Sequence, residues 1–335
     1  MKQLVSIDRI GAEFNDWIEV SYYIYGGCKF NCEYCFLVGY NRSDQWRQRT
    51  GGMRNVDLDT QYKIVDTLFR LSKPFNIYIY GGEPTEYKDL HNVIRYIHSK
   101  LPSDNFRTVE LQTNLNITVD DLKRYCEYDH IIISPTIHLN YLKGDTIYDL
   151  EAKLDLIHSY NKLERVDFML EPQQESLHRE FNGILKTKPY FDKVMHTFNY
   201  MEINTNKGGL HYYNDREDVY TGRFNTLNQY KDLLDTDNYK EQYKLTYDDG
   251  SSEVLDISEM YTRHLSFKGW KCDAGKFLMI IEYTGDWWIC ESKYMKQNPM
   301  GNLIKSPAKF LMQTRVHYAC DLDKCDGCYF VKKVK

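Results

Sequence analysis

The first 172 residues alternate between strand-like and helix-like segments, and this regularity constrains the fold more than any other feature. The strand-like segments are rich in β-branched and aromatic residues, whereas the segments between them carry apolar residues at helical spacing. Strands separated by helices pair in parallel through crossover connections. The sequence therefore predicts an α/β fold, a full or partial (β/α) barrel, with the site at the carboxyl ends of the strands. The five expected strands span residues 19–27, 75–84, 108–114, 130–138 and 165–172.

The chain beyond residue 172 is less regular. Its patterns predict helices over 189–201 and 225–243, a sixth strand over 209–214, and β-hairpins over 244–257 and 276–290. We expect a barrel domain over residues 1–240 with its core at 19–172, and insertion or lid elements within 173–265. A small C-terminal domain of a β-hairpin and a helix is expected over 266–335.

Composition and charge argue against several classes of function. The chain has 335 residues and a net charge of -5. General nucleic-acid-binding proteins present a basic face, so this charge argues against that class. No apolar run approaches the roughly 20 residues of a membrane span, and the first residues lack the apolar core of a signal peptide. We therefore expect a cytoplasmic protein with no membrane partner. Its nine cysteines would then be reduced, which favours metal binding over disulfides.

Three cysteines stand close together after the first expected strand, in the segment GGCKFNCEYCF of residues 26–36. Cys28, Cys32 and Cys35 have spacings of four and three, with no histidine or fourth cysteine nearby in the sequence. Thiolates suit zinc or iron–sulfur clusters. Zinc would need a remote fourth ligand. A [4Fe–4S] cluster on three cysteines would leave one iron open to an outside molecule, and we favour this interpretation.

The segment CKFNCEYC resembles the CxxxCxΦC signature of the radical S-adenosylmethionine (radical SAM) enzymes, with Tyr34 at the aromatic position. The resemblance implies that the amino and carboxylate groups of S-adenosylmethionine (SAM) bind the open iron, and that Tyr34 belongs to the cofactor site. It implies that the cluster passes one electron to the sulfonium, releasing methionine and a 5′-deoxyadenosyl radical. That radical would take a hydrogen atom from the substrate. The implied fold is a partial (β/α)6 barrel of the TIM type, in agreement with the strand–helix alternation.

A second motif, YGGEP at residues 80–84, ends the second expected strand. Glycines let a backbone approach a ligand closely, and the region of the glutamate supplies acceptors for an ammonium. A strand-to-helix turn that needs glycine would show the same residues. In radical SAM enzymes a GGEP motif at this place receives the methionine amino group. The resemblance therefore implies that Gly81, Gly82, Glu83 and Pro84 bind the cofactor.

Polar residues at the ends of the later strands are further candidates. The resemblance implies that Gln112, Asn114 and Ser134 contact SAM, although turn capping explains such residues equally well. His138 and Glu171 are weak catalytic candidates at the ends of the fourth and fifth strands. An imidazole titrates near neutral pH, so His138 is a candidate proton acceptor.

Five cysteines follow residue 270, and by themselves they favour a structural zinc site. The segment, however, resembles the Twitch or SPASM type of auxiliary domain that follows radical SAM barrels, which implies a second [4Fe–4S] cluster. The matching ligands are Cys272, Cys290, Cys325 and Cys328. Cys320 is left over as an alternative ligand, a packing residue or a weak catalytic candidate that donates a hydrogen atom, with packing as the default. Cys126 is expected to be buried packing.

The resemblance implies radical chemistry but leaves the substrate open. Our first interpretation is oxidation of a small molecule or formation of a carbon–carbon or carbon–sulfur bond, with the auxiliary cluster in electron transfer. The second is modification of a ribosomally made peptide, and the third is modification of a nucleotide or nucleobase. A flavodoxin- or ferredoxin-type protein would donate the electron. From a different class, a non-catalytic iron–sulfur or zinc scaffold is disfavoured, because a scaffold has no use for an open iron.

Overall fold

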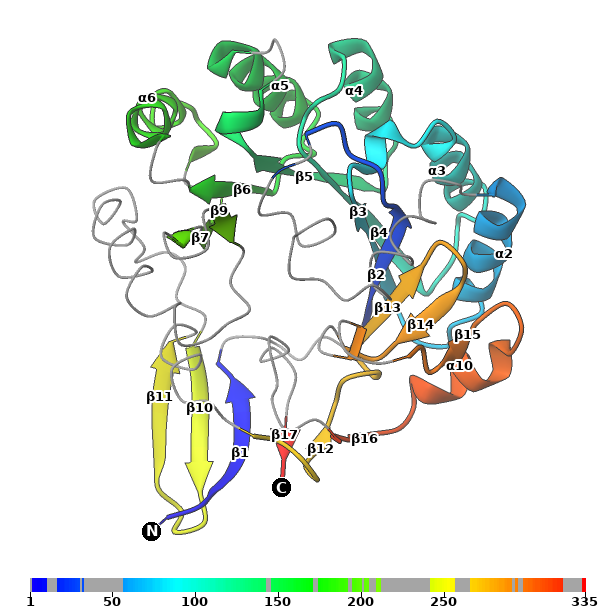
Figure 1. Cartoon of the computed structure of the whole chain (residues 1–335). Helices are drawn as coiled ribbons and strands as arrows, with labels where there is room; N and C mark the ends of the chain where they lie inside the picture. The colour runs from blue at the N-terminus through cyan, green and yellow to red at the C-terminus, as the bar shows by residue number, and fades with distance from the viewer. Residues whose placement is uncertain are drawn as a thin grey trace.

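The structure is a computed structural model of the whole chain. It describes residues 2–10, 17–30, 32, 57–142, 146–170, 174–191, 195–200, 202–204, 209–211, 242–256, 266–290, 293–294, 298–321 and 333–335. Two large sheets organise most of these residues: a nine-stranded sheet that curves into an open barrel, and a six-stranded sheet beside it (Figure 1). A third sheet has two strands.

Six parallel strands form the barrel, and helices cover their outer face (Figure 1). Each of the first four strands is followed along the chain by a helix, as predicted, and the helix that follows the fifth strand lies outside the expected range of 189–201. The strands are β2 (Ile18–Tyr25), β3 (Phe75–Gly81), β4 (Phe106–Thr113), β5 (Ile131–Ile137), β6 (Arg165–Leu170) and β7 (Met195–Tyr200). The helices are α2 (Leu58–Leu68), α3 (Leu90–His98), α4 (Val119–Cys126), α5 (Ile147–Ser159) and α6 (Glu175–Leu185), with short turns η1 (Pro84–Glu86) and η2 (Leu139–Tyr141).

The sixth parallel strand differs from the sequence prediction. β7 lies within residues 189–201, which we expected to be helical, and pairs with β6 from Met195 to Tyr200. The expected sixth strand instead contributes β9 (Gly209–His211), which pairs antiparallel with β8 (Glu202–Asn204). The spacing of apolar and aromatic residues over 195–200 fits both a helix and a strand. Pairing with the edge of β6 selects the strand.

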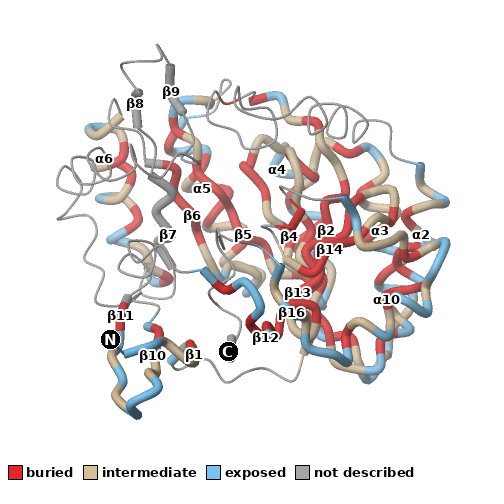
Figure 2. Tube along the Cα trace, turned by 60° about the horizontal axis from the view of Figure 1, so that its bottom comes forward, coloured by how far each residue is buried: buried red, intermediate tan, exposed pale blue. Residues whose placement is uncertain are grey.

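The C-terminal hairpin extends the barrel sheet instead of standing apart. As predicted, residues 276–290 form a hairpin, β13 (Leu278–Glu282) and β14 (Asp286–Trp288), turning at Gly285 with a φ of +83°. β13 pairs in parallel with β2, and β15 (Gly301–Asn302) completes the order β15-β14-β13-β2-β3-β4-β5-β6-β7. Helix α10 (Pro307–Gln313) follows. Many residues of β2, β5 and β13 in this sheet are buried and are drawn in red in Figure 2.

The second sheet joins segments from both ends of the chain. Its order is β11-β10-β1-β17-β12-β16, and all of its pairings are antiparallel. The predicted hairpin over 244–257 is present and lies at one edge of this sheet (Figure 1). The domain boundaries at residues 240 and 266 stay predictions. The strands are β1 (Leu4–Arg9), β10 (Gln242–Tyr247), β11 (Ser252–Asp256), β12 (Lys271–Cys272), β16 (Tyr318–Ala319) and β17 (Lys333–Val334).

No helix in the described part of the chain is both long and apolar enough to span a membrane.

A buried histidine between β6 and α6 predicts a pH-dependent stability. Burial lowers the pKa of His178 to about 4, so the unfolded chain binds more protons than the folded chain between about pH 4 and pH 6.5. The stabilisation is therefore complete above about pH 6.5 and is lost as the pH falls towards 4. The free energy of unfolding of the wild type falls when the pH is lowered from 7 to 5. We expect this fall to be about 2 kcal/mol smaller in His178→Phe.

Urea unfolding followed by circular dichroism at the two pH values measures this difference. His130→Phe is the matched control, because His130 is exposed and lies outside the packing of β6 against α6. Equal pH dependence in the wild type and His178→Phe would contradict the assignment.

Candidate active site

The cysteine loop starts where β2 ends, at the carboxyl end of the parallel sheet. Tyr25 is the last residue of β2, and Gly26 and Gly27 lead directly to Cys28. Cys28 and Cys32 are described, and Cys32 is buried at 7% exposure. Two of the three predicted ligands therefore lie at the end of the barrel where parallel α/β sheets place their sites. Tyr34 and Cys35 lie outside the described residues.

Backbone hydrogen bonds join the GGEP motif to the start of this loop. The Gly82 amide donates to the Tyr25 carbonyl at 2.8 Å, and the Glu83 amide donates to the Gly27 carbonyl at 2.7 Å. Gly81 has a φ of +149°, and a Cβ on it would lie 2.0 Å from the Tyr25 carbonyl oxygen. A Cβ on Gly82 would lie 2.2 Å from the Gly27 carbonyl oxygen. The two glycines are therefore required by the contact between the two motifs, and their contact with a ligand stays a prediction.

The Glu83 side chain ties the end of β3 to the end of β4. Its carboxylate is buried at 1% exposure and accepts hydrogen bonds from the Asn114 amide at 2.6 Å and the Thr113 hydroxyl at 2.8 Å. It also accepts from the amide and the hydroxyl of Thr85. Burial raises the pKa of Glu83 and these hydrogen bonds oppose the rise. Glu83 thus positions the motif, and its contact with a methionine ammonium stays a prediction. Pro84 is buried and begins η1.

We expect Gly82→Ala to disrupt this contact between the motifs. Real Cβ atoms do not approach backbone oxygens at 2.2 Å, so Gly82 and Gly27 must separate by most of an ångström. A displacement of about 1 Å at a reacting centre costs about 100-fold in rate. 5′-Deoxyadenosine formation, measured by chromatography and mass spectrometry, should fall by about that factor.

Gly183→Ala is the matched control for this substitution. Gly183 lies in α6 with nothing within 4 Å of an added Cβ, so alanine there should be neutral or stabilise the helix by about 1 kcal/mol. Full activity in Gly82→Ala would show that the motif contact does not position the reacting groups.

Side chains from the ends of β4, β5 and β6 and from the cysteine loop lie beside the two described thiols. The side-chain amide of Asn114 donates through Nδ2 to Cys28 Sγ at 3.5 Å. The imidazole Nδ1 of His138 lies 3.9 Å from Cys32 Sγ, and burial lowers the pKa of His138 to about 4, so the ring is neutral at neutral pH. Phe30 and Met169 are buried with Cys32 in one small apolar cluster. The structure therefore brings Asn114 and His138 to the cysteine loop.

The two remaining polar candidates make hydrogen bonds between neighbouring strands. Gln112 Nε2 donates to the Thr136 hydroxyl at 2.9 Å, and the Ser134 hydroxyl donates to Glu110 Oε1 at 2.5 Å. Their predicted contacts with SAM stay predictions. Glu171 lies outside the described residues.

The sequence analysis missed a charged network within the sheet. Arg165 lies 3.2 Å from both Glu110 and Asp167, and also donates to the Tyr78 hydroxyl. These residues come from β3, β4 and β6, so the network ties three strands together. Burial raises the pKa of Glu110, and the nearby Arg165 guanidinium opposes the rise. The sequence did carry a signal for this network, the alternation of polar and apolar residues in RVDFML. Alternate residues of a strand share a face, so this pattern places Arg165 and Asp167 together on the face of the sheet that the helices do not cover.

The late cysteines lie on the second sheet and just beyond the C-terminal hairpin. Cys272 ends β12 and is buried, whereas Cys290 follows β14 and Cys320 follows β16. All three pack on one apolar cluster that contains Phe267 and Trp270. Cys325 and Cys328 lie outside the described residues. Among the described residues, no three histidine, cysteine or acidic side chains are close enough to hold one metal ion.

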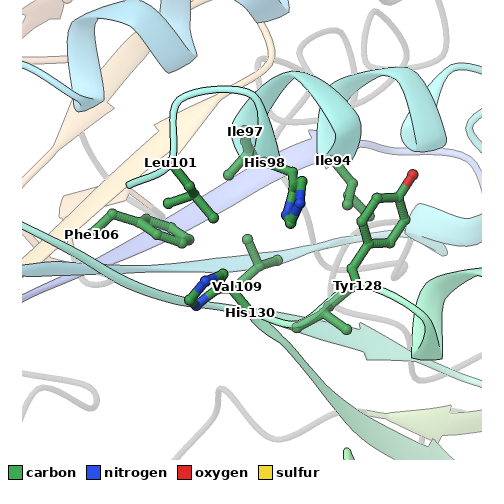
Figure 3. Close-up of a pocket in the computed structure, with 9 residues that line it drawn as sticks. Ile94, Ile97, His98, Leu101, Phe106, Val109, Tyr128 and His130 are labelled. Atoms are coloured by element: carbon green, nitrogen blue, oxygen red, sulfur yellow. The ribbon is translucent and has the colours of Figure 1, made fainter. Parts of the chain in front are cut away.

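A small apolar hollow lies at the opposite, amino-terminal end of the strands (Figure 3). His98, from the end of α3, and His130, just before β5, face it together with Tyr128. Sites of parallel α/β barrels form at the carboxyl ends of strands, so we do not assign this hollow to the active site.

Fold and site together define an α/β barrel that gathers cysteine thiols beside a glycine-rich turn at the carboxyl ends of its first two strands. The family model of the Radical SAM superfamily matches residues 22–202, more than half of the sequence. The chain therefore belongs to the radical SAM superfamily, an enzyme family that uses SAM and a [4Fe–4S] cluster. The soft thiol donors and the adjoining motif in this structure fit such a cluster.

The likeness to solved structures covers most of this chain and is not confined to the barrel. Hexahistidine-tagged anSMEcpe with bound AdoMet has a TM-score of 0.55 and 13% sequence identity, covering 89% of this chain and 82% of that one. Native anSMEcpe with bound AdoMet and a Cp18Cys peptide has a TM-score of 0.54 and 15% identity, covering 89% and 81%. Streptococcus suis SuiB bound to S-adenosylmethionine has a TM-score of 0.51 and 15% identity, covering 86% and 63%. No curated protein matches the sequence.

Proposed function

We propose that the chain cleaves SAM reductively and uses the resulting radical to remove a hydrogen atom from its substrate. Cys28, Cys32 and Cys35 would hold the [4Fe–4S] cluster with one iron open to SAM. When bound, this cofactor pair supplies the 5′-deoxyadenosyl radical. The observation that carries the proposal is the pair of backbone hydrogen bonds between Tyr25–Gly27 and Gly82–Glu83, which fixes the cysteine loop against the GGEP motif.

The described residues have distinct parts in this proposal. Asn114 donates to the Cys28 sulfur and would stabilise its thiolate. Phe30 and Met169 cover Cys32 with apolar surface and would keep water from the cluster. Tyr34, Gln112 and Ser134 would line the SAM site further along the strand ends.

A peptide is our proposed substrate class, in place of the small molecule that came first in the sequence analysis. The support is the likeness over 89% of this chain to anSMEcpe, a protein whose structures include one with a Cp18Cys peptide. A short peptide encoded beside the gene should then stimulate 5′-deoxyadenosine formation and change in mass. Stimulation by small molecules alone would restore the first interpretation, and stimulation by nucleotides would select the third.

We also propose a second [4Fe–4S] cluster in the C-terminal region, which would transfer electrons between the substrate and an external acceptor. Cys272 and Cys290 are held on one apolar cluster, in keeping with a common site. Cys325 and Cys328 complete the set that the resemblance implies. A flavodoxin- or ferredoxin-type protein would donate the electron to the barrel cluster. The insertion or lid role of residues 173–265 stays a hypothesis.

Anaerobic reconstitution with iron and sulfide tests the proposed function. We expect about eight irons per chain, and 5′-deoxyadenosine when dithionite and SAM are added. A non-catalytic scaffold would form none of this product under the same conditions. About four irons together with zinc would leave the radical chemistry in place and remove the second cluster.

A further inference from the structure

We propose that Cys320 is a thiolate ligand of the auxiliary [4Fe–4S] cluster, beside Cys272 and Cys290. This inference rests on the proposed second cluster and changes its ligand set: Cys320 takes the place of Cys325, so that four thiolates bind the four irons. The resemblance to auxiliary domains gives four ligands without Cys320 and leaves that residue to packing. The structure places it with the two described ligands.

Strand register puts Cys320 on the same face as Cys272. Cys272 lies opposite Tyr318 in the antiparallel pair of β12 and β16. The Cys320 amide donates to the Trp270 carbonyl at 2.9 Å, and the Gly269 amide donates to the Cys320 carbonyl at 2.7 Å, so Gly269 and Trp270 together lie opposite Cys320 in a β-bulge next to the paired residues. Opposite residues and residues two apart share a face of a strand pair. Cys272 and Cys320 are therefore diagonal neighbours, which agrees with their packing on one apolar cluster.

The diagonal separation suits a cluster better than a disulfide. Diagonal neighbours have Cβ atoms about 7–8 Å apart, whereas a disulfide requires about 3.5–4.5 Å. Two thiolates at the wider spacing can reach different irons of one cluster. Cys290 packs against the same apolar cluster where that cluster adjoins the main core.

A half-exposed ion pair joins the chain segments that carry Cys290 and Cys320, because the Asp321 side chain is 52% exposed. Lys293 Nζ lies 3.0 Å from Asp321 Oδ2, and the Lys293 side chain is only 6% exposed. Lys293 is three residues after Cys290, and Asp321 directly follows Cys320. The Lys293 ammonium also lies over the Tyr318 ring, 4.4 Å from its centre.

A similar contact fixes the segment that carries Cys272. The His317 imidazole pairs with the carboxylate of Asp273, and its Nε2 lies 3.2 Å from Lys276 Nζ. Residues 317–321 are therefore bound through side chains to the neighbours of both described ligands. Packing alone gives no account of the position of Cys320, which remains partly exposed, whereas the packing cysteine Cys126 is buried at 1% exposure.

The test uses full-length protein in which Cys28, Cys32 and Cys35 are alanine, so that only the auxiliary cluster can form. We expect about four irons per chain in this background and fewer than about one after Cys320→Ala. Cys126→Ala in the same background is the control and should keep its iron. Retention of iron and of an unchanged electron paramagnetic resonance (EPR) spectrum in Cys320→Ala would overturn the inference.

A second measurement needs no substitution and so does not depend on folding of a variant. Iron-loaded wild-type protein is alkylated with iodoacetamide before and after removal of iron by a chelator, and each cysteine is quantified by mass spectrometry. Cys320 should be protected to the same degree as Cys272 and Cys290, and become reactive after chelation. Equal labelling of Cys320 in both forms would overturn the inference. Absence of iron from the triple-alanine background would contradict the second cluster itself.

Discussion

Cys32→Ala should abolish 5′-deoxyadenosine formation, reducing it to less than about 1% of the wild-type rate. The physical reason is the loss of one of three thiolates, because two cannot hold a [4Fe–4S] cluster with a single open iron. The protein should keep about four irons in the C-terminal region and remain folded, since alanine only shortens one side chain of a small apolar cluster that is separate from the main core. Anaerobic assays with dithionite and SAM, combined with iron analysis, measure both results.

Cys126→Ala is the control for this experiment. Cys126 is buried at the end of α4 and packs in the main core, as the sequence analysis expected. Its replacement should cost some stability while leaving both the iron content and the rate unchanged. Comparable product formation by Cys32→Ala and the wild type would show that the cysteine loop does not hold the catalytic cluster.

Arg165→Met should destabilise the barrel by about 3 kcal/mol. Arg165 lies 3.2 Å from both Glu110 and Asp167, and the Asp167 side chain is only 6% exposed. Removing one partner from such a pair leaves buried charge without compensation, which costs about 3–5 kcal/mol. Partial exposure of Arg165 places this site at the lower end of that range. Urea unfolding followed by circular dichroism measures the change.

An exposed arginine provides the matched control. Arg124 pairs with Asp121 on the surface of α4, where its side chain is 67% exposed, so Arg124→Met should cost less than about 1 kcal/mol. Adding Glu110→Gln and Asp167→Asn to Arg165→Met should recover part of the lost stability, because the uncompensated charges are removed with the arginine. Equal stability of Arg165→Met and Arg124→Met would contradict a structural role for the network.

The barrel strands could be predicted because their signals are local. Aromatic and β-branched runs that end in glycine mark β2 and β3, and apolar residues at helical spacing mark α2 and α3 between the strands. The position of β7 could not be predicted in the same way, since its residues suit a helix as well as a strand and only pairing with β6 settles the choice.

Contacts between distant segments were beyond the sequence analysis. β13 pairs with β2 across more than 250 residues, and β1 pairs with β10 across more than 230 residues. No short-range pattern encodes such partners, because any exposed strand edge can accept another strand.

In the candidate site, too, features encoded by neighbouring residues could be predicted, and features that depend on distant residues could not. The cysteine spacing and the GGEP motif identified the family from a few residues each. The role of Glu83 depends on Thr113 and Asn114 at the end of another strand, so the sequence could indicate a ligand contact but not the hydrogen bonds that the carboxylate makes. The proximity of Cys320 to Cys272 similarly depends on the register of two very short strands.

The most direct measurement is the EPR spectrum of the reduced barrel cluster before and after addition of SAM. A variant with Cys272 and Cys290 replaced by alanine isolates that cluster from the auxiliary one. If the cysteine loop leaves an iron open to SAM, the spectrum changes when SAM is added, and the same sample forms 5′-deoxyadenosine. A spectrum that is identical with and without SAM would contradict the account.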